Sequence, residues 1–326
     1  MRVLITDGAF VGVEQALRPA VERFGWDLVI AADEGEAQRE LAGCELLVLK
    51  NFELQAAQIE RAAHLRGVQK LGLLTLNIDR HQLARRSIPL RTLMLPSSAA
   101  VADHTIALLL ALTRQLLSGG VVMHAPPVDI AAVTTDERHF VYNWAGMSAS
   151  ALHGKMLGLI GFGEIALQVA KRAQAFGMIV RYAKRHPLPA EVERRFRIRA
   201  TSLDDLLRGS DVVSLHVPQS PETEGLIGAD ELARMKAGAL LVNTSRGAIV
   251  DEDALVDSLT RGHLGGAGLD VFRIEPLPLG SPLLTAPRIV LTPHVAGAGP
   301  HALSDAVARA LSRWPATLRA TGARDH

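Results

Sequence analysis

A glycine-rich segment in the middle of the chain constrains the fold most strongly. Residues 158–166 read Gly-Leu-Ile-Gly-Phe-Gly-Glu-Ile-Ala. The apolar run 155–160 predicts a strand before the glycines, and the helical spacing of Val169 and Ala173 predicts a helix over 166–176 after them. Strand, glycine turn and helix form the dinucleotide-binding fingerprint, in which N–H groups at the helix N-terminus hold a pyrophosphate.

Each position of this fingerprint has a physical reason. Gly161 permits the tight turn, Gly163 lets the backbone approach the phosphates, and Ala166 allows close packing of helix on strand. Glu164 and Ile165 open the helix and are expected to lie beside the cofactor. The alternative is an ordinary glycine-rich turn, since the glycine pattern alone is a weak signal.

Short apolar runs alternate with helical patterns along all 326 residues, which predicts an α/β fold with parallel sheets. The fingerprint lies in mid-chain, so we expect two doubly wound domains: a flavodoxin-like substrate domain (1–97 and 297–326) and an inserted Rossmann domain (98–296) that binds NAD(P). The cleft between them is the expected substrate site. The expected strands are 3–6, 27–31, 46–49, 68–74, 90–93, 155–160, 178–183, 212–216, 239–243, 265–270 and 289–292, with long helices at 99–117 and 302–319.

Composition excludes several other classes. The net charge of +1 gives no overall field for nucleic acid or an anionic membrane. The single cysteine, Cys44, excludes an internal disulfide and is expected to be a buried, inert thiol. No signal-peptide layout is present, and charged residues interrupt the apolar run 101–117, so a soluble cytoplasmic protein is expected. No ligand cluster has the spacing of a metal site, so no metal is expected.

Three of the expected strands end in polar residues suited to catalysis. In a doubly wound sheet ligands bind beyond the carboxyl ends of strands, so Arg246, Asp270 and His294 are expected to converge. An Arg can grip a substrate carboxylate with two hydrogen bonds, and a His polarised by a carboxylate can protonate a carbonyl oxygen as hydride arrives. This set suits hydride transfer involving a 2-keto or 2-hydroxy acid.

From about Leu46 onward the chain resembles the D-isomer-specific 2-hydroxyacid dehydrogenases, which include phosphoglycerate dehydrogenase and the glyoxylate/hydroxypyruvate reductases. The resemblance is carried by a series of motifs in order: Val101-Ala102-Asp103-His104-Thr105, Gly154-Lys155, His216-Val217-Pro218, Pro221-Glu222-Thr223, Asn243-Thr244-Ser245-Arg246-Gly247, Asp270-Val271-Phe272, Glu275-Pro276 and Thr292-Pro293-His294.

The resemblance implies roles for individual residues. Arg246 resembles the anchor of the substrate carboxylate, Glu275 the acid paired with the catalytic His, and His294 the proton donor. Asp270 resembles the residue that orients the nicotinamide. The implied cofactor contacts are Gly161, Gly163, Glu164, Ile165, Lys184, Arg185, His186, Val217, Pro218, Thr223, Thr244, Ser245, Arg246, Asp270, His294, Ala296 and Gly297. An anionic Glu275 is expected to raise the pKa of His294.

Each of these residues has a simpler interpretation. Arg246 could pair on the surface with the neighbouring Asp251 or Glu252. Asp270 could cap a turn, and Glu275 could be a solvated loop acid. Most histidines do no chemistry, and the sequence gives His104 and His216 hydrogen-bonding or packing roles.

The end of the second strand of the cofactor domain indicates which dinucleotide binds. Members of the family that use NAD usually carry an acid at the position of Lys184, where it binds the ribose hydroxyls. Here Lys184, Arg185 and His186 follow the strand, and such cations attract a 2′-phosphate. NADPH is therefore expected over NADH, with a solvated basic loop as the alternative. Glu164 weighs against this, being a carboxylate beside the pyrophosphate site.

The first domain departs from the family at Leu73, Leu74, Thr75 and Leu76. Relatives commonly have a glycine at Leu74, in a loop whose N–H groups face the substrate. Leu73, Leu74 and Thr75 are still expected to contact substrate, in a narrower or more apolar pocket, although the leucines could instead be core. This departure keeps open a catalytically silent dinucleotide sensor or scaffold of the same fold. The helix 99–117 and the polar stretch after it resemble the dimerisation region of the family, which implies a homodimer.

Overall fold

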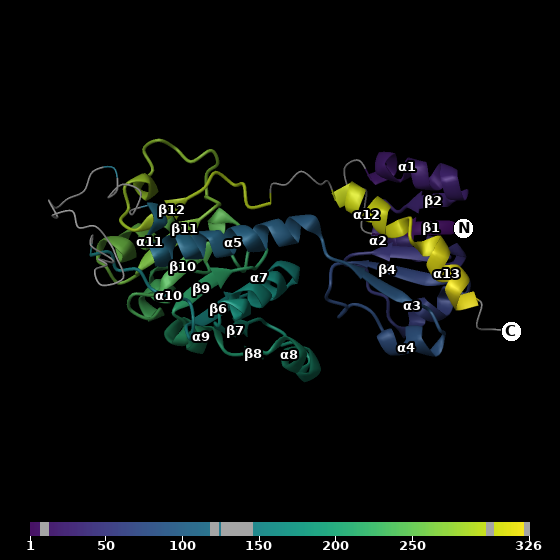
Figure 1. Cartoon of the computed structure of the whole chain (residues 1–326), viewed down its shortest axis with the longest axis horizontal. Helices are drawn as coiled ribbons and strands as arrows, with labels where there is room; N and C mark the ends of the chain where they lie inside the picture. Colours follow the sequence, from purple (N-terminus) through teal and green to yellow (C-terminus); the bar gives the residue numbers. More distant parts are fainter. Residues whose placement is uncertain (7–12, 118–123, 125–145, 298–302, 323–326) are drawn as a thin grey trace, which may run out of the picture. The chain divides into compact units, whose positions relative to one another are not determined.

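The structure is a computed structural model that describes residues 1–6, 13–117, 124, 146–297 and 303–322. The chain forms two compact units, Met1–Ala99 with Ala298–His326 (unit 1) and Ala100–Gly297 (unit 2). The sequence placed the two boundaries after residues 97 and 296. Both units are layered α/β structures built on parallel sheets (Figure 1). The expected fold class is therefore confirmed.

Unit 1 has a five-stranded sheet in the order β2-β1-β3-β4-β5, which is the flavodoxin-like order. Alternate residues of its strands face two hydrophobic clusters: Leu4 and Leu47 pack with α2, α3 and α4, whereas Val3 and Val48 pack with α1, α12 and α13. Its elements are β1 (Arg2–Ile5), α1 (Val13–Phe24), β2 (Asp27–Ile30), α2 (Glu34–Glu40), β3 (Leu46–Leu49), α3 (Ala56–Arg61), β4 (Gly67–Leu71), α4 (Arg80–Arg85), β5 (Leu90–Leu93), α12 (Leu303–Leu311) and α13 (Trp314–Gly322).

Cys44 lies in the first of these clusters and is fully buried, as expected. Burial raises the pKa of its thiol to about 12, so the thiolate is not populated at neutral pH. The expected helix 302–319 is wrong in one respect, because the structure has two helices there. Pro315 lacks an N–H and clashes with the preceding turn, so it is tolerated at the start of α13 but not inside one continuous helix.

Unit 2 has a seven-stranded sheet in the order β12-β11-β10-β9-β6-β7-β8. From β6 the strand order runs through β7 to β8 at one end of the sheet, and then from β9, on the other side of β6, to β12 at the other end. The position between β6 and β9 is the switch point where doubly wound folds bind ligands. Its elements are α5 (Pro96–Arg114, which begins in unit 1), β6 (Met156–Ile160), α7 (Glu164–Ala175), β7 (Ile179–Ala183), α8 (Ala190–Phe196), β8 (Ile198–Ala200), α9 (Leu203–Gly209), β9 (Val212–Leu215), α10 (Ala229–Arg234), β10 (Leu240–Asn243), α11 (Glu252–Thr260), β11 (Gly266–Leu269) and β12 (Ile289–Leu291).

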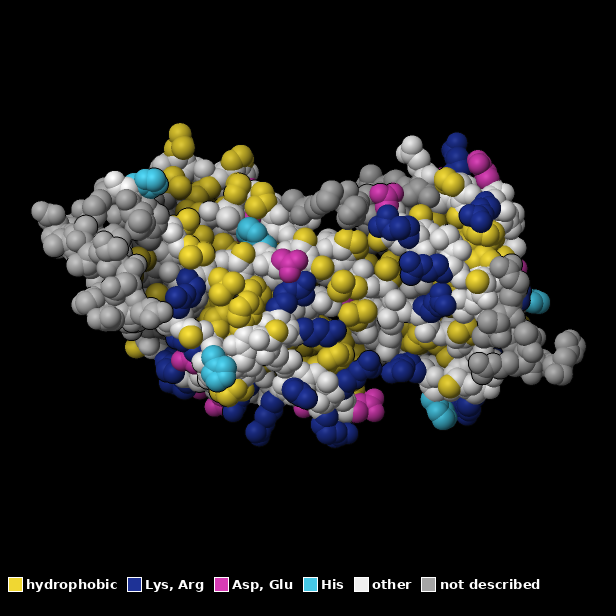
Figure 2. Space-filling model, viewed as in Figure 1, with side chains coloured by type: hydrophobic (Ala, Val, Ile, Leu, Met, Phe, Trp, Pro, Cys, Tyr) yellow, Lys and Arg dark blue, Asp and Glu magenta, His cyan; other side chains and the backbone are white. Residues whose placement is uncertain are grey.

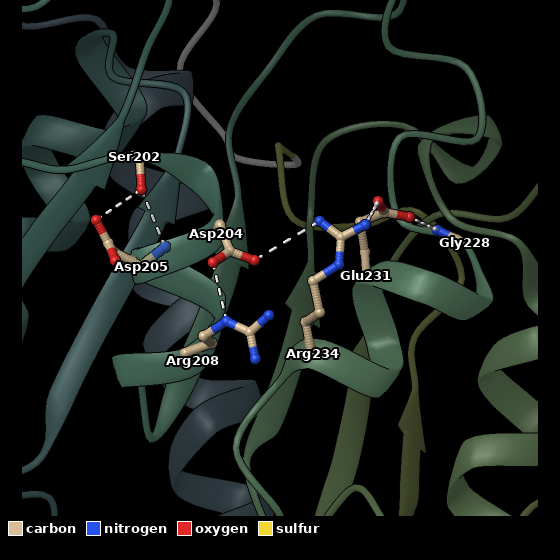
Figure 3. Close-up of polar contacts among 7 residues, drawn as sticks. All are labelled: Ser202, Asp204, Asp205, Arg208, Gly228, Glu231 and Arg234. Atoms are coloured by element: carbon tan, nitrogen blue, oxygen red, sulfur yellow. Dashed lines mark hydrogen bonds and ion pairs between the residues drawn. The ribbon is translucent and has the colours of Figure 1, made fainter.

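Helices cover both faces of this sheet. On one face, α9, α10 and α11 share a hydrophobic cluster with Ala267 and Leu269 of β11. Asp204 of α9 joins two of these helices on the surface, where it pairs with Arg208 at 2.9 Å and with Arg234 of α10 at 3.8 Å (Figure 3). These pairs are exposed and contribute little to stability, so the buried cluster is what joins the helices to the sheet.

The opposite face of unit 2 carries α5, whose Leu108 side chain lies directly over Gly268. By length and composition α5 could cross a membrane, contrary to the sequence expectation that Asp103, His104 and Arg114 exclude this. The buried core helices of soluble proteins meet the same test. Here Ala102, Ile106 and Leu109 are buried as well, so one side of α5 is a core helix face.

Candidate active site and cofactor site

The fingerprint forms the expected turn at the carboxyl end of β6. Gly161 has a φ of +86°, and a Cβ there would lie 2.6 Å from the carbonyl oxygen of His216. Gly161 therefore cannot carry a side chain, because β6 and the segment after β9 approach too closely. Gly163 is the N-cap of α7, no side chain caps this end of the helix, and a Cβ at Gly163 would meet only open space. The residues present fit a pyrophosphate at the start of α7.

The remaining predicted cofactor residues lie on segments that follow successive strands of unit 2. They are Glu164 and Ile165 at the start of α7; Lys184, Arg185 and His186 after β7; Val217, Pro218 and Thr223 after β9; Thr244, Ser245 and Arg246 after β10; Asp270 after β11; and His294, Ala296 and Gly297 after β12. In a parallel sheet all these segments leave from the carboxyl edge. The geometry therefore gathers them at one edge of unit 2, although no contact with a ligand tests their individual roles.

The residues after β7 are open to solvent: Lys184, Arg185 and His186 are all exposed. Arg185 also acts on the loop after β9. A hydrogen bond from Ser220 and the positive charge of Arg185 lower the pKa of Glu222, which is fully exposed. Within that loop Thr223 donates to the carbonyl of Pro218 at 2.7 Å and accepts from the N–H of Ser220 at 2.8 Å.

His294 and Glu275 form a direct pair, with His294 Nδ1 lying 2.6 Å from Glu275 Oε2. The other carboxylate oxygen accepts from the N–H of Phe272 at 2.9 Å. An ionised carboxylate only accepts, so Nδ1 carries the hydrogen and Nε2 faces away from Glu275. The His294 side chain is 49% exposed, so this nitrogen can reach a ligand.

Glu275 is held in its anionic form. Partial burial works to raise its pKa, but the hydrogen bonds from His294 and Phe272 and the positive charges of His294 and Arg246 outweigh this and lower it. Glu275 is therefore an ionised carboxylate beside the His294 ring at neutral pH.

Arg246 reaches this pair because the backbones of two loops touch. A Cβ on Gly247 would lie 1.8 Å from the carbonyl carbon of Phe272, so only glycine lets the segment after β10 lie against the one that leads to Glu275. Asn243, which is buried, shapes the same segment by accepting from Ser245 and donating to the carbonyl of Arg246 at 2.9 Å.

The simpler interpretation of Arg246 is wrong in this structure. Among the described residues its guanidinium forms no ion pair with Asp251 or Glu252; Asp251 caps α11 through the N–H of Ala254, and Glu252 accepts from the N–H of Arg273. Arg246 is exposed and donates to the adjacent carbonyl of Ser245 at 2.6 Å. A guanidinium has five N–H donors, so an exposed Arg246 can still bind a carboxylate with those that remain.

Asp270 is fully buried, and its carboxylate is used inside the protein. Oδ1 accepts from Thr292 Oγ1 at 2.6 Å and from the N–H of Val295 at 2.9 Å, and Oδ2 accepts from the N–H of Ala296 at 2.8 Å. The Asp270 carbonyl accepts from the N–H of His294 at 2.8 Å. One residue thus binds three successive N–H groups of the loop that carries His294. From the sequence, Asp270 was expected to cap a turn or to orient the nicotinamide. These hydrogen bonds to the N–H groups of residues 294–296, called the Asp270 clamp below, were not predicted.

His216 and His104, which were not expected to take part in catalysis, have the hydrogen-bonding roles expected of them. His216 Nε2 lies 2.9 Å from Ser214 Oγ, and removal from water lowers its pKa to about 3, which keeps it neutral. His104 Nε2 lies 2.8 Å from Thr292 Oγ1. No role was predicted for Asn243 or Thr292 from the sequence. Each is a polar residue at the end of a strand, close in sequence to a predicted catalytic residue, and this position could have indicated a role.

In unit 1 the loop after β4 contradicts the interpretation of its leucines as core residues. Leu73, Leu74 and Thr75 are half-buried and Leu76 is 45% exposed, so none of them belongs to the core. Gly72 has a φ of +115°, which ends β4 at Leu71 rather than at residue 74. A substrate contact by Leu73, Leu74 and Thr75 remains a prediction. No group of metal-binding side chains was found among the residues that the structure describes.

Comparison with known proteins agrees with this geometry. The profile of the D-isomer specific 2-hydroxyacid dehydrogenase NAD binding domain matches residues 127–296. Glyoxylate/hydroxypyruvate reductase B of Pectobacterium carotovorum is 37% identical, over 85% of this chain and 83% of its own. D-3-phosphoglycerate dehydrogenase of Mycobacterium bovis is 35% identical, over 77% of this chain and 44% of its own. Among solved structures, the TT0316 protein of Thermus thermophilus is 35% identical with a TM-score of 0.57, over 96% of this chain and 95% of its own.

Proposed function

Since the chain belongs to the D-isomer specific 2-hydroxyacid dehydrogenases, we propose that it reduces small 2-keto acids to D-2-hydroxy acids and prefers NADPH. That it is an oxidoreductase of this family, with a nicotinamide dinucleotide as cofactor, follows from the match to the NAD binding domain and from the named relatives. The hydrogen-bonded pair of His294 and Glu275, with Arg246 close enough to act on Glu275, carries the proposal of 2-keto acid reduction.

The roles of the three residues follow from their chemistry. Arg246 binds the substrate carboxylate with two parallel hydrogen bonds. His294 donates the proton on Nε2 to the carbonyl oxygen. A nicotinamide dinucleotide held at the start of α7 would supply the hydride that the carbonyl carbon needs. Glu275 accepts from Nδ1 throughout, which fixes the orientation of the ring and stabilises the imidazolium before the proton leaves.

The preference for NADPH rests on the residues after β7. Lys184 and Arg185 are exposed cations at the position where an acid would bind a free ribose, and a 2′-phosphate can pair with both. The positive charge of Arg185 contributes to the lowered pKa of Glu222, so Arg185 lies near the loop after β9. We expect Lys184→Glu to favour NADH.

The deciding experiment measures NADPH and NADH oxidation with glyoxylate, hydroxypyruvate, pyruvate and longer 2-keto acids. We expect turnover that His294→Ala reduces by about 10²-fold or more, as for a lost acid–base group. Cofactor binding without turnover of any substrate on the panel would contradict the proposal and favour a dinucleotide sensor. A preference for NADH in the wild type would refute the interpretation of Lys184 and Arg185 alone.

We also propose that the protein is a homodimer. Hydrophobic side chains gather on the face of unit 2 that α5 crosses (Figure 2), and Leu116 and Leu117 beyond its end are 59% and 61% exposed. Exposed apolar patches of this kind often mark protein interfaces. The polar stretch after α5, which also carries the family resemblance, lies mostly outside the described residues. Light scattering of the purified protein tests this, and a monomeric mass would contradict it.

A further inference from the structure

The motif 101–105 on α5 matched the family but received no role in the chemistry above. The Nε2 atom of its fourth residue, His104, lies 2.8 Å from Thr292 Oγ1 and 3.4 Å from Asp270 Oδ1. Its side chain is 21% exposed and Asp270 is fully buried. In such a place, where little water screens it, a polar contact is stronger than on the surface.

The direction of these hydrogen bonds can be deduced. The Asp270 carboxylate cannot donate, so the single hydroxyl hydrogen of Thr292 goes to Asp270 Oδ1. Thr292 must then accept from His104, which means that Nε2 of His104 carries a hydrogen. The result is a directed chain from His104 through Thr292 to Asp270.

This chain ends on the residue that clamps the loop of His294. The backbone of His294 has a φ of +53°, a left-handed conformation that costs a residue with a side chain about 1–3 kcal/mol. Such a conformation persists only where the surroundings enforce it. Here the enforcing contacts are the three N–H groups of residues 294–296 bound by Asp270.

We infer that His104 is a positioning residue for the proton donor. Through Thr292 it orients the Asp270 carboxylate, which binds the N–H groups of Val295 and Ala296 and so holds the adjoining His294 in its left-handed backbone conformation. The inference rests on the proposed function for its kinetic consequence. Its structural consequence, an ordered 294–296 backbone, does not depend on any substrate.

The test compares His104→Ala, His104→Gln and Thr292→Val with the wild type. Two quantities are measured: kcat and KM for the keto acid, and hydrogen–deuterium exchange of the peptide that covers 294–296. We expect His104→Ala to lower kcat by about tenfold or more, because small misplacements of a catalytic group are costly. Amide exchange of this peptide should rise by about tenfold as the loop opens more often. The glutamine amide can donate a hydrogen bond to Thr292, so His104→Gln should have a kcat and an amide exchange rate closer to those of the wild type than His104→Ala has.

Two further variants separate positioning from a general loss of stability. Asp103→Ala, the neighbouring position, removes a surface pair with Arg172 and should leave kcat and the exchange of 294–296 unchanged. The double variant His104→Ala/Thr292→Val should lose no more than Thr292→Val alone, since both act through one chain. A fully additive loss in the double variant would contradict the chain. If His104→Ala folds poorly, Thr292→Val alone tests the chain, because it should lower kcat and raise the exchange of 294–296 by itself.

The outcomes distinguish this inference from the proposed function. If the wild type reduces no keto acid, the proposed function fails, and amide exchange alone decides on His104. If the wild type is active but His104→Ala matches it in both kcat and exchange, the positioning role is refuted while the proposed function stands.

Discussion

At the scale of single residues, the site depends on charges that its members supply to one another. Glu275 is anionic because His294 and Arg246 favour its ionised form and outweigh its partial burial. A group whose pKa is lowered by folding stabilises the folded state above its ordinary value of 4.5, and this contribution is lost as pH falls through the lowered value. The pair is therefore complete at neutral pH and breaks only in acid.

Glu275→Gln tests this charge. The amide can still accept a hydrogen bond from Nδ1 of His294, but it places no negative charge beside the ring during proton transfer. We expect the alkaline limb of the pH profile for reduction to move to lower pH and kcat near neutrality to fall by about tenfold or more. The measurement is kcat/KM for the keto acid against pH. An unchanged profile would remove Glu275 from the mechanism.

Arg246→Lys tests the carboxylate anchor. Lysine keeps the positive charge but cannot form two parallel bonds to one carboxylate. We expect the KM for the keto acid to rise by about tenfold or more, with a larger rise for Arg246→Leu, because hydrogen bonds to charged groups contribute roughly 1.5–3 kcal/mol. The KM for NADPH is the internal control. A rise in both constants together would instead indicate a role of Arg246 in cofactor binding.

At the scale of elements, the loops after β10 and β11 must touch for the site to exist, and Gly247 is where they do. Gly247→Ala would place a methyl group 1.8 Å from the carbonyl carbon of Phe272, so one backbone must move. We expect a loss of about 1–3 kcal/mol in the free energy of unfolding, as for other overpacked sites, and a fall in kcat/KM as Arg246 leaves Glu275. Thermal unfolding and steady-state kinetics measure the two effects.

Gly280→Ala is the matched control for that experiment. Gly280 lies in the same unit on an exposed loop, and a Cβ there would meet no atom within 4 Å. It should change neither quantity measurably. Equal effects of the two substitutions would show that the close contact at Gly247 is not what joins the loops.

The elements also show how far sequence patterns reach. The strands of both sheets and the fingerprint helix follow from apolar runs and glycines, because buried parallel strands and amphipathic helices need those patterns whatever their neighbours. β8 was missed, since its three residues, Ile198–Ala200, stand in an arginine-rich stretch and pair along only one edge. The Asp270 clamp was missed because its partners are backbone N–H groups, which no side-chain pattern announces.

At the scale of the whole molecule, the chain consists of two units with hydrophobic clusters of their own, and the predicted cofactor residues all belong to unit 2. Two of the three tryptophans, Trp26 and Trp314, are buried in unit 1. The third, Trp144, lies outside the described residues. A Trp144→Phe variant would therefore have tryptophan fluorescence that reports on unit 1 alone.

This variant allows the cofactor to be assigned to a unit by thermal unfolding. A ligand present at 100 times its Kd stabilises the state that binds it by about 2.7 kcal/mol, which should raise the melting temperature of unit 2 by roughly 5–10 °C. We expect NADPH to raise a calorimetric transition by this amount and to leave the tryptophan transition where it was. If the tryptophan transition rises equally, the two units unfold as one. If only the tryptophan transition rises, the cofactor binds unit 1, and the assignment of Gly161, Gly163 and Lys184 to its site is refuted.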